Sequence, residues 1–327
     1  MKTFGKLDTG ATIHEYLLKN SDAEVSIITF GAIVRKFCVF GTDIVGGYDK
    51  IEDYLNDDSH QGGIIGRVAN RIADAKFVMD GAEYNLPKND GENCLHGGVG
   101  FDRRVWNVLE YTDTSILLSL KSGDMEEGFP AELDVTVRYT LECTSLKIEY
   151  SAKPYGKTPI ALTNHSYFNL NGLGGTILDH TVEIFADRYT EVGDDLIPNG
   201  NRPEVTGSAF DLTKPIEIGK HVGTDFIGYD HNFILCPTEY ENGLGLAARV
   251  CGEDLKMSVY TDQPGVQFYI GNFLGGAPDF KGGIKRVLHG AFCLETQTEP
   301  NCINHGIGFY DEGEEYTHTT VYKIEKK

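Results

Sequence analysis

A strict alternation of apolar and polar residues in one long segment constrains the fold more than any other feature of this chain. From Leu133 to Leu141 the odd-numbered positions are apolar and the positions between them are polar. This period of two is typical of a half-buried β-strand, whose successive side chains point to opposite faces. Shorter runs of the same kind recur at residues 25–29, 32–39, 116–120, 146–151, 182–185, 256–260 and 316–324. The chain is therefore predicted to be all-β.

Turn dipeptides separate many of these runs and favour antiparallel pairing. Asp80-Gly81, Asn171-Gly172, Asn199-Gly200 and Asn242-Gly243 all contain residues that tolerate the positive φ that tight hairpins need. Helical periodicity is confined to short pieces, most clearly residues 50–56, which argues against a wound βαβ fold. Because no linker, repeat or low-complexity block divides the sequence, we expect residues 1–327 to form one large antiparallel β-sandwich domain.

The charge balance excludes several classes of partner. With 49 acidic against 29 basic residues the net charge is −20, which repels nucleic acids and anionic membrane surfaces. No stretch approaches the ~20 apolar residues of a membrane helix, and the first residues lack the basic-then-apolar order of a secretory signal. We therefore expect a cytoplasmic protein, a monomer or homodimer, whose partner is a small molecule.

The seven cysteines are spread along the chain and include no CxxC pair. This spacing predicts neither a disulfide framework nor a zinc clip. We expect reduced and mostly buried thiols.

The glycine-rich segments 62–67, 96–100 and 172–175 lack the spacing of a phosphate-binding loop, which argues against a nucleotide ligand.

His165 interrupts a hydrophobic, strand-like run at residues 158–170. An imidazole titrates near neutral pH and can give and take a proton in one turnover. If the run is one strand, alternation places Thr163, His165, Tyr167 and Asn169 on one face. A buried histidine satisfied by its neighbours is the structural alternative, and we favour a reactive group.

Glu295 breaks a second apolar run, at residues 291–297. In a strand it shares a face with Cys293 and Gln297. An unpaired buried carboxylate costs several kcal/mol or shifts its pKa upward, so such a residue is normally paired or functional. The pattern indicates that Glu295 is the base that partners His165.

Five further residues are candidates for binding a polar ligand. Arg71 offers a forked donor beside the amide of Asn70, a combination suited to hydroxyl oxygens, whereas Arg67 is expected to form a surface salt bridge. His96 lies at a turn before Gly97 and Gly98. Two more candidates, Asp230 at a strand start and Gln267 within an apolar strand, have structural alternatives in turn chemistry and in satisfying a neighbouring backbone.

Taken together, these segments resemble the aldose 1-epimerase (galactose mutarotase) family. The matching blocks, in family order, are GRVANR (66–71), LHGG (95–98), TNHSYFNL (163–170), YDH (229–231), PGVQFY (264–269), LETQ (294–297) and YTHTTVY (316–322). The chain departs from the commonest family pattern after the base, at residues 297–302. Contacts at the rim and hexose preference are the properties that this departure affects.

The resemblance implies a β-sandwich with a cleft across one sheet, an aldose substrate, no metal and no organic cofactor. It implies that His165 protonates the ring oxygen, that Glu295 removes the proton of the anomeric hydroxyl, and that Arg71, His96, Asp230 and Gln267 hold the sugar. Opening a hemiacetal needs just such a pair of groups, with no hydride and no nucleophile.

Four alternatives remain open from the residues. An epimerase of a hexose 6-phosphate needs a basic patch, and a sugar sensor keeps the cleft without turnover. A glycoside hydrolase would pair Glu295 with Asp230. A mononuclear metal site from His96, His165, Asp230 and Glu295 lacks a short-spaced ligand pair and is the least favoured.

Overall fold

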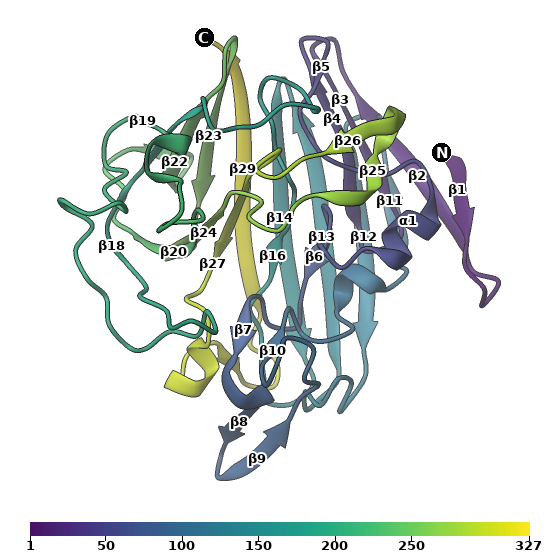
Figure 1. The fold of residues 1–327 in the computed structure, drawn as a ribbon. Helices are drawn as coiled ribbons and strands as arrows, with labels where there is room; N and C mark the ends of the chain where they lie inside the picture. Colours follow the sequence, from purple (N-terminus) through teal and green to yellow (C-terminus); the bar gives the residue numbers. More distant parts are fainter.

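The computed structural model describes residues 1–327 and confirms the all-β prediction. Its largest sheet is antiparallel, and its strands lie in the order β11 (Asn107–Tyr111), β12 (Ser115–Ser122), β13 (Leu133–Glu142), β14 (Ser145–Pro154), β29 (Tyr316–Lys326), β23 (Leu255–Thr261), β22 (Leu244–Cys251), β17 (Thr181–Ile184) and β19 (Ile216–Glu217). A tenth strand, β21 (Tyr240–Glu241), pairs with β22. The C-terminal strand β29 lies in the middle and joins the two halves of the sheet (Figure 1).

Two smaller sheets face this large one. The N-terminal sheet has the order β1 (Lys2–Lys6), β2 (Thr12–Lys19), β3 (Ala23–Ile28), β4 (Ile33–Val39) and β5 (Thr42–Asp43). The other, here called the site sheet, has the order β18 (Ala186–Tyr189), β20 (Asp230–Leu235), β24 (Gly265–Tyr269) and β27 (Cys293–Gln297).

Short elements complete the fold. The two-stranded pairs are β6 (Ile64–Ile65) with β16 (Thr163–Asn164), β7 (Arg71–Ile72) with β10 (Cys94–Leu95), β8 (Lys76–Met79) with β9 (Ala82–Asn85), β15 (Thr158–Pro159) with β28 (Phe309–Tyr310), and β25 (Gly276–Phe280) with β26 (Ile284–Arg286). The helix α1 spans Ile51–Asn56, as predicted, and single 3₁₀ turns lie at Ala73–Ala75, Phe101–Arg103, Ile218–His221, Lys281–Gly283 and Cys302–His305. No helix is long and apolar enough to cross a membrane.

The core lies between the large sheet and the two smaller ones. Its main cluster contains 52 buried residues, drawn from Leu18 near the N-terminus to Ile324 near the C-terminus. Buried tyrosines also connect the layers by hydrogen bonds, because a buried hydroxyl needs a partner. Tyr139 of β13 donates to the carbonyl of Ala32 at 2.6 Å, and Tyr322 of β29 donates to the carbonyl of Leu294 at 2.9 Å. The second bond fixes β29 against the strand that carries Glu295.

The hairpin predictions are correct at two of the four dipeptides. Asp80-Gly81 closes the β8–β9 hairpin and Asn242-Gly243 closes β21–β22, and all four residues have positive φ. Asn171-Gly172 and Asn199-Gly200 lie in loops that do not join paired strands.

The prediction of one strand through residues 158–170 is wrong. Only Thr158–Pro159 and Thr163–Asn164 are strands, and every residue from 161 to 170 is buried, so the segment has no exposed face. It breaks because its backbone changes partner: the amide of His165 donates to Gly63 at 3.0 Å, whereas that of Phe168 donates to Phe292 at 2.7 Å. The segment therefore crosses from β6 to the edge of β27.

The prediction for Arg67 is also wrong. Its side chain is buried, at 2% exposure, and has no acidic partner within salt-bridge distance. Its guanidinium instead donates to the carbonyls of Pro130 and Ala131 and to the Ser122 hydroxyl, at 2.7–2.9 Å. The prediction of mostly buried thiols is wrong as well. All seven cysteines are free, but only Cys94, Cys293 and Cys302 are buried.

Replacing Arg67 by methionine is expected to lower the free energy of unfolding by about 3–5 kcal/mol, because several buried acceptors lose their only cationic donor. Urea unfolding followed by circular dichroism measures this loss. Arg188→Met is the matched control, since that side chain is 44% exposed and pairs with Glu204 at the surface. A loss below ~1 kcal/mol for Arg67→Met would show that the buried network contributes little.

Candidate active site

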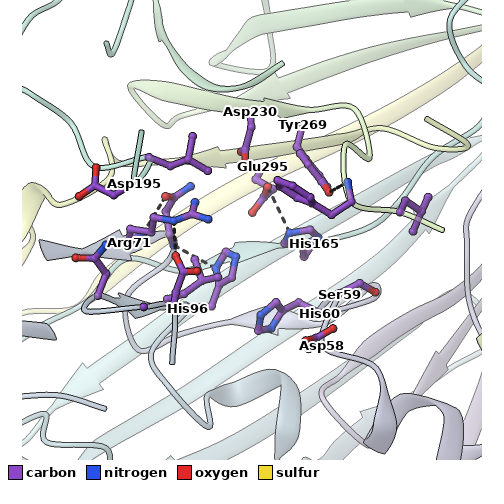
Figure 2. A pocket seen from close by; sticks show the side chains of 18 of the residues that line it. Asp58, Ser59, His60, Arg71, His96, His165, Asp195, Asp230, Tyr269 and Glu295 are labelled. Atoms are coloured by element: carbon purple, nitrogen blue, oxygen red, sulfur yellow. Dashed lines mark hydrogen bonds and ion pairs between the residues drawn. The ribbon is translucent and has the colours of Figure 1, made fainter. Parts of the chain in front are cut away.

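Six of the seven predicted site residues line one cavity of about 780 Å³. They are Asn70, Arg71, His96, His165, Asp230 and Glu295, and Figure 2 shows the side chains of the last five converging on a common space. The seventh, Gln267, does not line the cavity but donates from Nε2 to Oδ1 of Asp230 at 2.7 Å. The fold thus brings all seven residues together, although they are spread over more than 200 positions of the sequence.

The site sheet positions Asp230, Gln267 and Glu295. These residues lie on the neighbouring strands β20, β24 and β27, and the register places Gln267 directly opposite Glu295. Asp230 lies opposite Tyr269, two residues along the same strand from Gln267. Residues two apart on a strand share a face. The central strand therefore holds Gln267 between the two carboxylates.

His165 stands beside Glu295 even though it does not belong to a long strand. Two residues before it, Thr163 donates its hydroxyl to the Thr296 carbonyl at 2.9 Å, which ties the segment to β27. The Nε2 atom of His165 lies 3.7 Å from Oε1 of Glu295, and its Nδ1 atom lies 3.5 Å from the sulfur of Cys293. Both members of the pair are buried, with 6% and 2% of their surface exposed. Asn169, predicted to share this face, instead donates to the Gly290 carbonyl away from the cavity.

His96 is held in one tautomer by Asn70. Asn70 directly precedes β7 and His96 directly follows β10, so the two residues lie at the same end of this antiparallel ladder, and both have left-handed φ angles, of 62° and 54°. The amide of His96 donates to the Asn70 carbonyl at 3.0 Å, and the amide of Asn70 donates to Nδ1 of His96 at 3.2 Å. A nitrogen that accepts carries no proton, so neutral His96 has its hydrogen on Nε2. His96 is therefore a hydrogen-bond donor towards the cavity.

Arg71 is anchored by one edge of its guanidinium. Its Nε donates to Oδ2 of Asp90 at 2.6 Å, and its side chain is 12% exposed. The ion pair fixes the orientation of the planar group, which leaves its terminal nitrogens as donors at the cavity (Figure 2).

Burial moves the pKa values of His165 and Glu295 in opposite directions. It raises the pKa of Glu295 well above its usual range, and the nearby charge of Asp230 adds to that rise. Burial also lowers the pKa of His165 to about 3, with a smaller contribution from His60. The pair consequently keeps one proton between these limits. One proton on two groups is what a reaction needs when one group donates and the other accepts.

Asp230→Asn is expected to move the alkaline limb of the activity profile to lower pH. The alkaline limb is where the pair loses its single proton, which the raised pKa of Glu295 retains. Removing the negative charge of Asp230 lowers that pKa, so the proton leaves at lower pH, whereas the acidic limb, set by His165, stays in place. The dependence of kcat on pH measures both limbs. Equal movement of both limbs, or none, would contradict this electrostatic account.

Several residues that line the cavity were given no role from the sequence, among them His60, Tyr269 and Arg286. Tyr269 is the last residue of the PGVQFY segment (264–269). Its hydroxyl oxygen accepts a hydrogen bond from the Phe273 amide at 3.1 Å. Arg286 is paired with Asp57 at 2.6 Å. His60 is a single histidine before Gln61-Gly62-Gly63, and no spacing in the sequence distinguishes it. Only the fold places it near His96, with ring centroids 4.5 Å apart.

The donor set is a poor fit to a metal ion. His96, His165 and Glu295 each offer one ligand atom, and these atoms lie within 4.8 Å of one another, while Asp230 is not in the group. A histidine that binds a metal usually donates a hydrogen bond from its other nitrogen. In His96 that nitrogen accepts one from Asn70, so Nε2 carries a proton where a metal would need a lone pair.

A β-sandwich with a buried imidazole and a buried carboxyl group facing each other in a polar cavity is suited to an enzyme that acts on a polar substrate. The family model for aldose 1-epimerase matches residues 14–323. Galactose mutarotase from Bos taurus is 43% identical over 98% of this chain and 97% of its own length, and aldose 1-epimerase from Escherichia coli K12 is 36% identical over 84% and 82%. The crystal structure of galactose 1-epimerase from Lactobacillus acidophilus is 27% identical, with a TM-score of 0.88 over 99% of this chain and 97% of that one. The chain belongs to the aldose 1-epimerase family.

Proposed function

We propose that the protein interconverts the α and β anomers of a free hexose such as galactose or glucose, with His165 and Glu295 moving the protons. The observation that carries the proposal is the His165–Glu295 pair. Its facing atoms lie 3.7 Å apart, buried, at the wall of a cavity large enough for a monosaccharide. Groups with opposed proton roles must sit on one substrate at the same time, and this separation allows that.

The reaction needs two proton transfers in each direction. In the free enzyme the raised pKa of Glu295 keeps the pair's single proton on the carboxyl group, so that proton first passes to Nε2 of His165. His165 then gives it to the ring oxygen while the Glu295 carboxylate takes the proton of the C1 hydroxyl. The bond between C1 and the ring oxygen breaks, and C1 becomes an aldehyde that keeps its own oxygen. After rotation about C1–C2 the ring oxygen attacks the other face of the carbonyl. Glu295 then returns its proton to the C1 oxygen and His165 takes back its own, so the enzyme is regenerated.

The remaining residues supply complementary contacts to hydroxyl groups. Arg71 and His96 donate, Asp230 accepts, and the side chain of Asn70 at the cavity wall can do both. Gln267 does not line the cavity, and its amide instead fixes the orientation of the Asp230 carboxylate by a hydrogen bond. Such positioning places the anomeric centre between the acid and the base.

The charge of the cavity favours a neutral hexose over a hexose phosphate. Carboxylates, including Asp58, Asp194 and Asp195, outnumber its two guanidinium groups. Both guanidinium groups are already paired, Arg71 with Asp90 and Arg286 with Asp57. A phosphate dianion would face uncompensated negative charge.

Polarimetry of freshly dissolved α-D-galactose and α-D-glucose tests the proposal. We expect equilibration far faster than the spontaneous reaction, and we expect a chelator to leave the rate unchanged. Binding without acceleration would support a sugar sensor, and release of nitrophenol from an aryl galactoside would support a hydrolase. Loss of activity on chelation would support a metal at His96, His165 and Glu295.

We further propose that residues 1–327 act as one domain, in a monomer or homodimer that resides in the cytoplasm. The main core cluster draws residues from Leu18 to Ile324, which supports a single folding unit. All seven cysteines are free, as is usual in a reducing compartment.

A further inference from the structure

We propose that His60 is a further sugar-binding residue of this site, held by Asp102 so that its outer nitrogen accepts a hydrogen bond from a substrate hydroxyl. The inference rests on the proposed function, because it names an additional contact to the same substrate. It concerns a residue that lies outside the acid–base pair and outside the set predicted from the sequence.

The contact with Asp102 fixes the tautomer of His60. Nδ1 of His60 lies 2.9 Å from Oδ2 of Asp102, a carboxylate that is only 3% exposed. An ionised carboxylate can only accept, so Nδ1 carries the hydrogen, and neutral His60 keeps its lone pair on Nε2. That nitrogen has no hydrogen-bond partner within the protein and is not among the fully buried polar atoms. The side chain lines the cavity and is 12% exposed, so the free acceptor is accessible from the cavity.

Two unusual backbone features hold His60 and Asp102 in place. His60 has a left-handed φ of 55°, a conformation that residues other than glycine seldom adopt and that clusters at functional sites. Asp102 packs closely against the backbone at Gly63, where an added Cβ would lie 2.6 Å from the Asp102 Cβ. Such a close approach is open only to glycine at position 63.

His60 and His96 have opposite hydrogen-bonding polarity. Their rings meet edge to face with centroids 4.5 Å apart, on the side of the cavity away from Asp230 and Tyr269 (Figure 2). His96 presents an N–H, because the Asn70 amide occupies its other nitrogen, whereas His60 presents a lone pair. A hydroxyl group both accepts and donates, so the pair matches a sugar hydroxyl held between them. His60 is 6.0 Å from the His165 ring, close enough to act on the same substrate.

The first test pairs His60→Phe with substrates that lack one hydroxyl. We expect KM for galactose to rise about 5–10-fold with kcat within ~3-fold, since a neutral hydrogen bond contributes about 1 kcal/mol. Among the 2-, 3-, 4- and 6-deoxy derivatives, one should bind the wild type weakly and lose nothing further in the variant. His60→Gln, which keeps an acceptor, should restore most of the loss. An equal rise in KM for every deoxy sugar, or an unchanged KM, would overturn the proposal.

The second test needs no substitution at position 60. In ¹⁵N-labelled protein, the histidine ring resonances should show His60 as the Nδ1–H tautomer, and its Nε2 signal should shift when galactose is added. A proton on Nε2, or a signal unaffected by saturating galactose, would overturn the proposal even if the variant failed to fold. Failure of the wild type to accelerate anomer exchange would instead refute the proposed function, which separates the two outcomes.

Discussion

Replacing Glu295 by glutamine is expected to lower kcat by about 10²–10⁴-fold, the range that a positioned base contributes. Glutamine has nearly the same shape as a protonated glutamic acid but cannot take the proton of the C1 hydroxyl. KM should change by less than ~3-fold, because the lost interaction acts in the transition state. The fold should persist, since the raised pKa of Glu295 shows that its site disfavours charge and the amide is neutral. Stopped-flow polarimetry gives both constants, and thermal unfolding checks the fold.

Glu312→Gln is the matched control for this change. Glu312 is exposed and makes no side-chain hydrogen bond or salt bridge, so the same chemical replacement there should leave kcat unaltered. A Glu295→Gln enzyme with near-wild-type kcat would remove Glu295 from the mechanism. A loss confined to KM would make Glu295 a binding group rather than the base.

Replacing His165 by asparagine is expected to cost a similar factor, about 10²–10⁴-fold in kcat, because asparagine cannot protonate the ring oxygen. The variant should retain the backbone bonds that fix this segment, from His165 to Gly63 and from Phe168 to Phe292, since these involve main-chain atoms. His305→Asn at an exposed position serves as the control. Retained turnover in His165→Asn would assign the acid role to another group.

Combining the two substitutions should cost little more than the worse single change. Groups that act as one unit show strongly non-additive effects, because removing either already abolishes the concerted proton transfer. The double variant Glu295→Gln/His165→Asn is compared with both single variants by the same polarimetric assay. Losses that multiply would show that the two residues contribute independently.

The sequence predicted those parts of the fold in which one face of a strand meets solvent. The long alternation over residues 132–142 became β13 (Leu133–Glu142), and β12, β14 and β29 likewise alternate between buried and partly exposed positions, because half-buried strands show their period in the residue types. The run at residues 25–29 also became a strand, although it is buried throughout. Glu295 was predicted for a related reason. A carboxylate within an apolar strand is costly enough that its presence calls for a function.

The sequence did not predict features that arise where both faces are buried or where distant loops meet. Residues 161–170 are all buried, so no alternation remained to show the break after Asn164. The environment of Arg67 was predicted wrongly because its hydrogen-bond acceptors come from segments some 55–91 positions away. The left-handed conformations of Asn70 and His96, which fix the His96 tautomer, have no glycine to signal them. The tautomer of His60 depends on its contact with Asp102, 42 positions further along the chain, and the residues around His60 do not indicate that contact.

The most direct test of the account follows the oxygen atom on C1. Galactose labelled with ¹⁸O at that position is incubated with the enzyme for many turnovers in unlabelled water, and the label is read by mass spectrometry against an enzyme-free sample. If His165 and Glu295 open the ring, the bond between C1 and the ring oxygen breaks while the C1 oxygen stays attached, so the label should remain at the level of the enzyme-free sample while the anomers equilibrate. Loss of the label in step with turnover would show that the C1–hydroxyl bond breaks instead, as in glycoside hydrolysis, and would contradict ring opening by this acid–base pair.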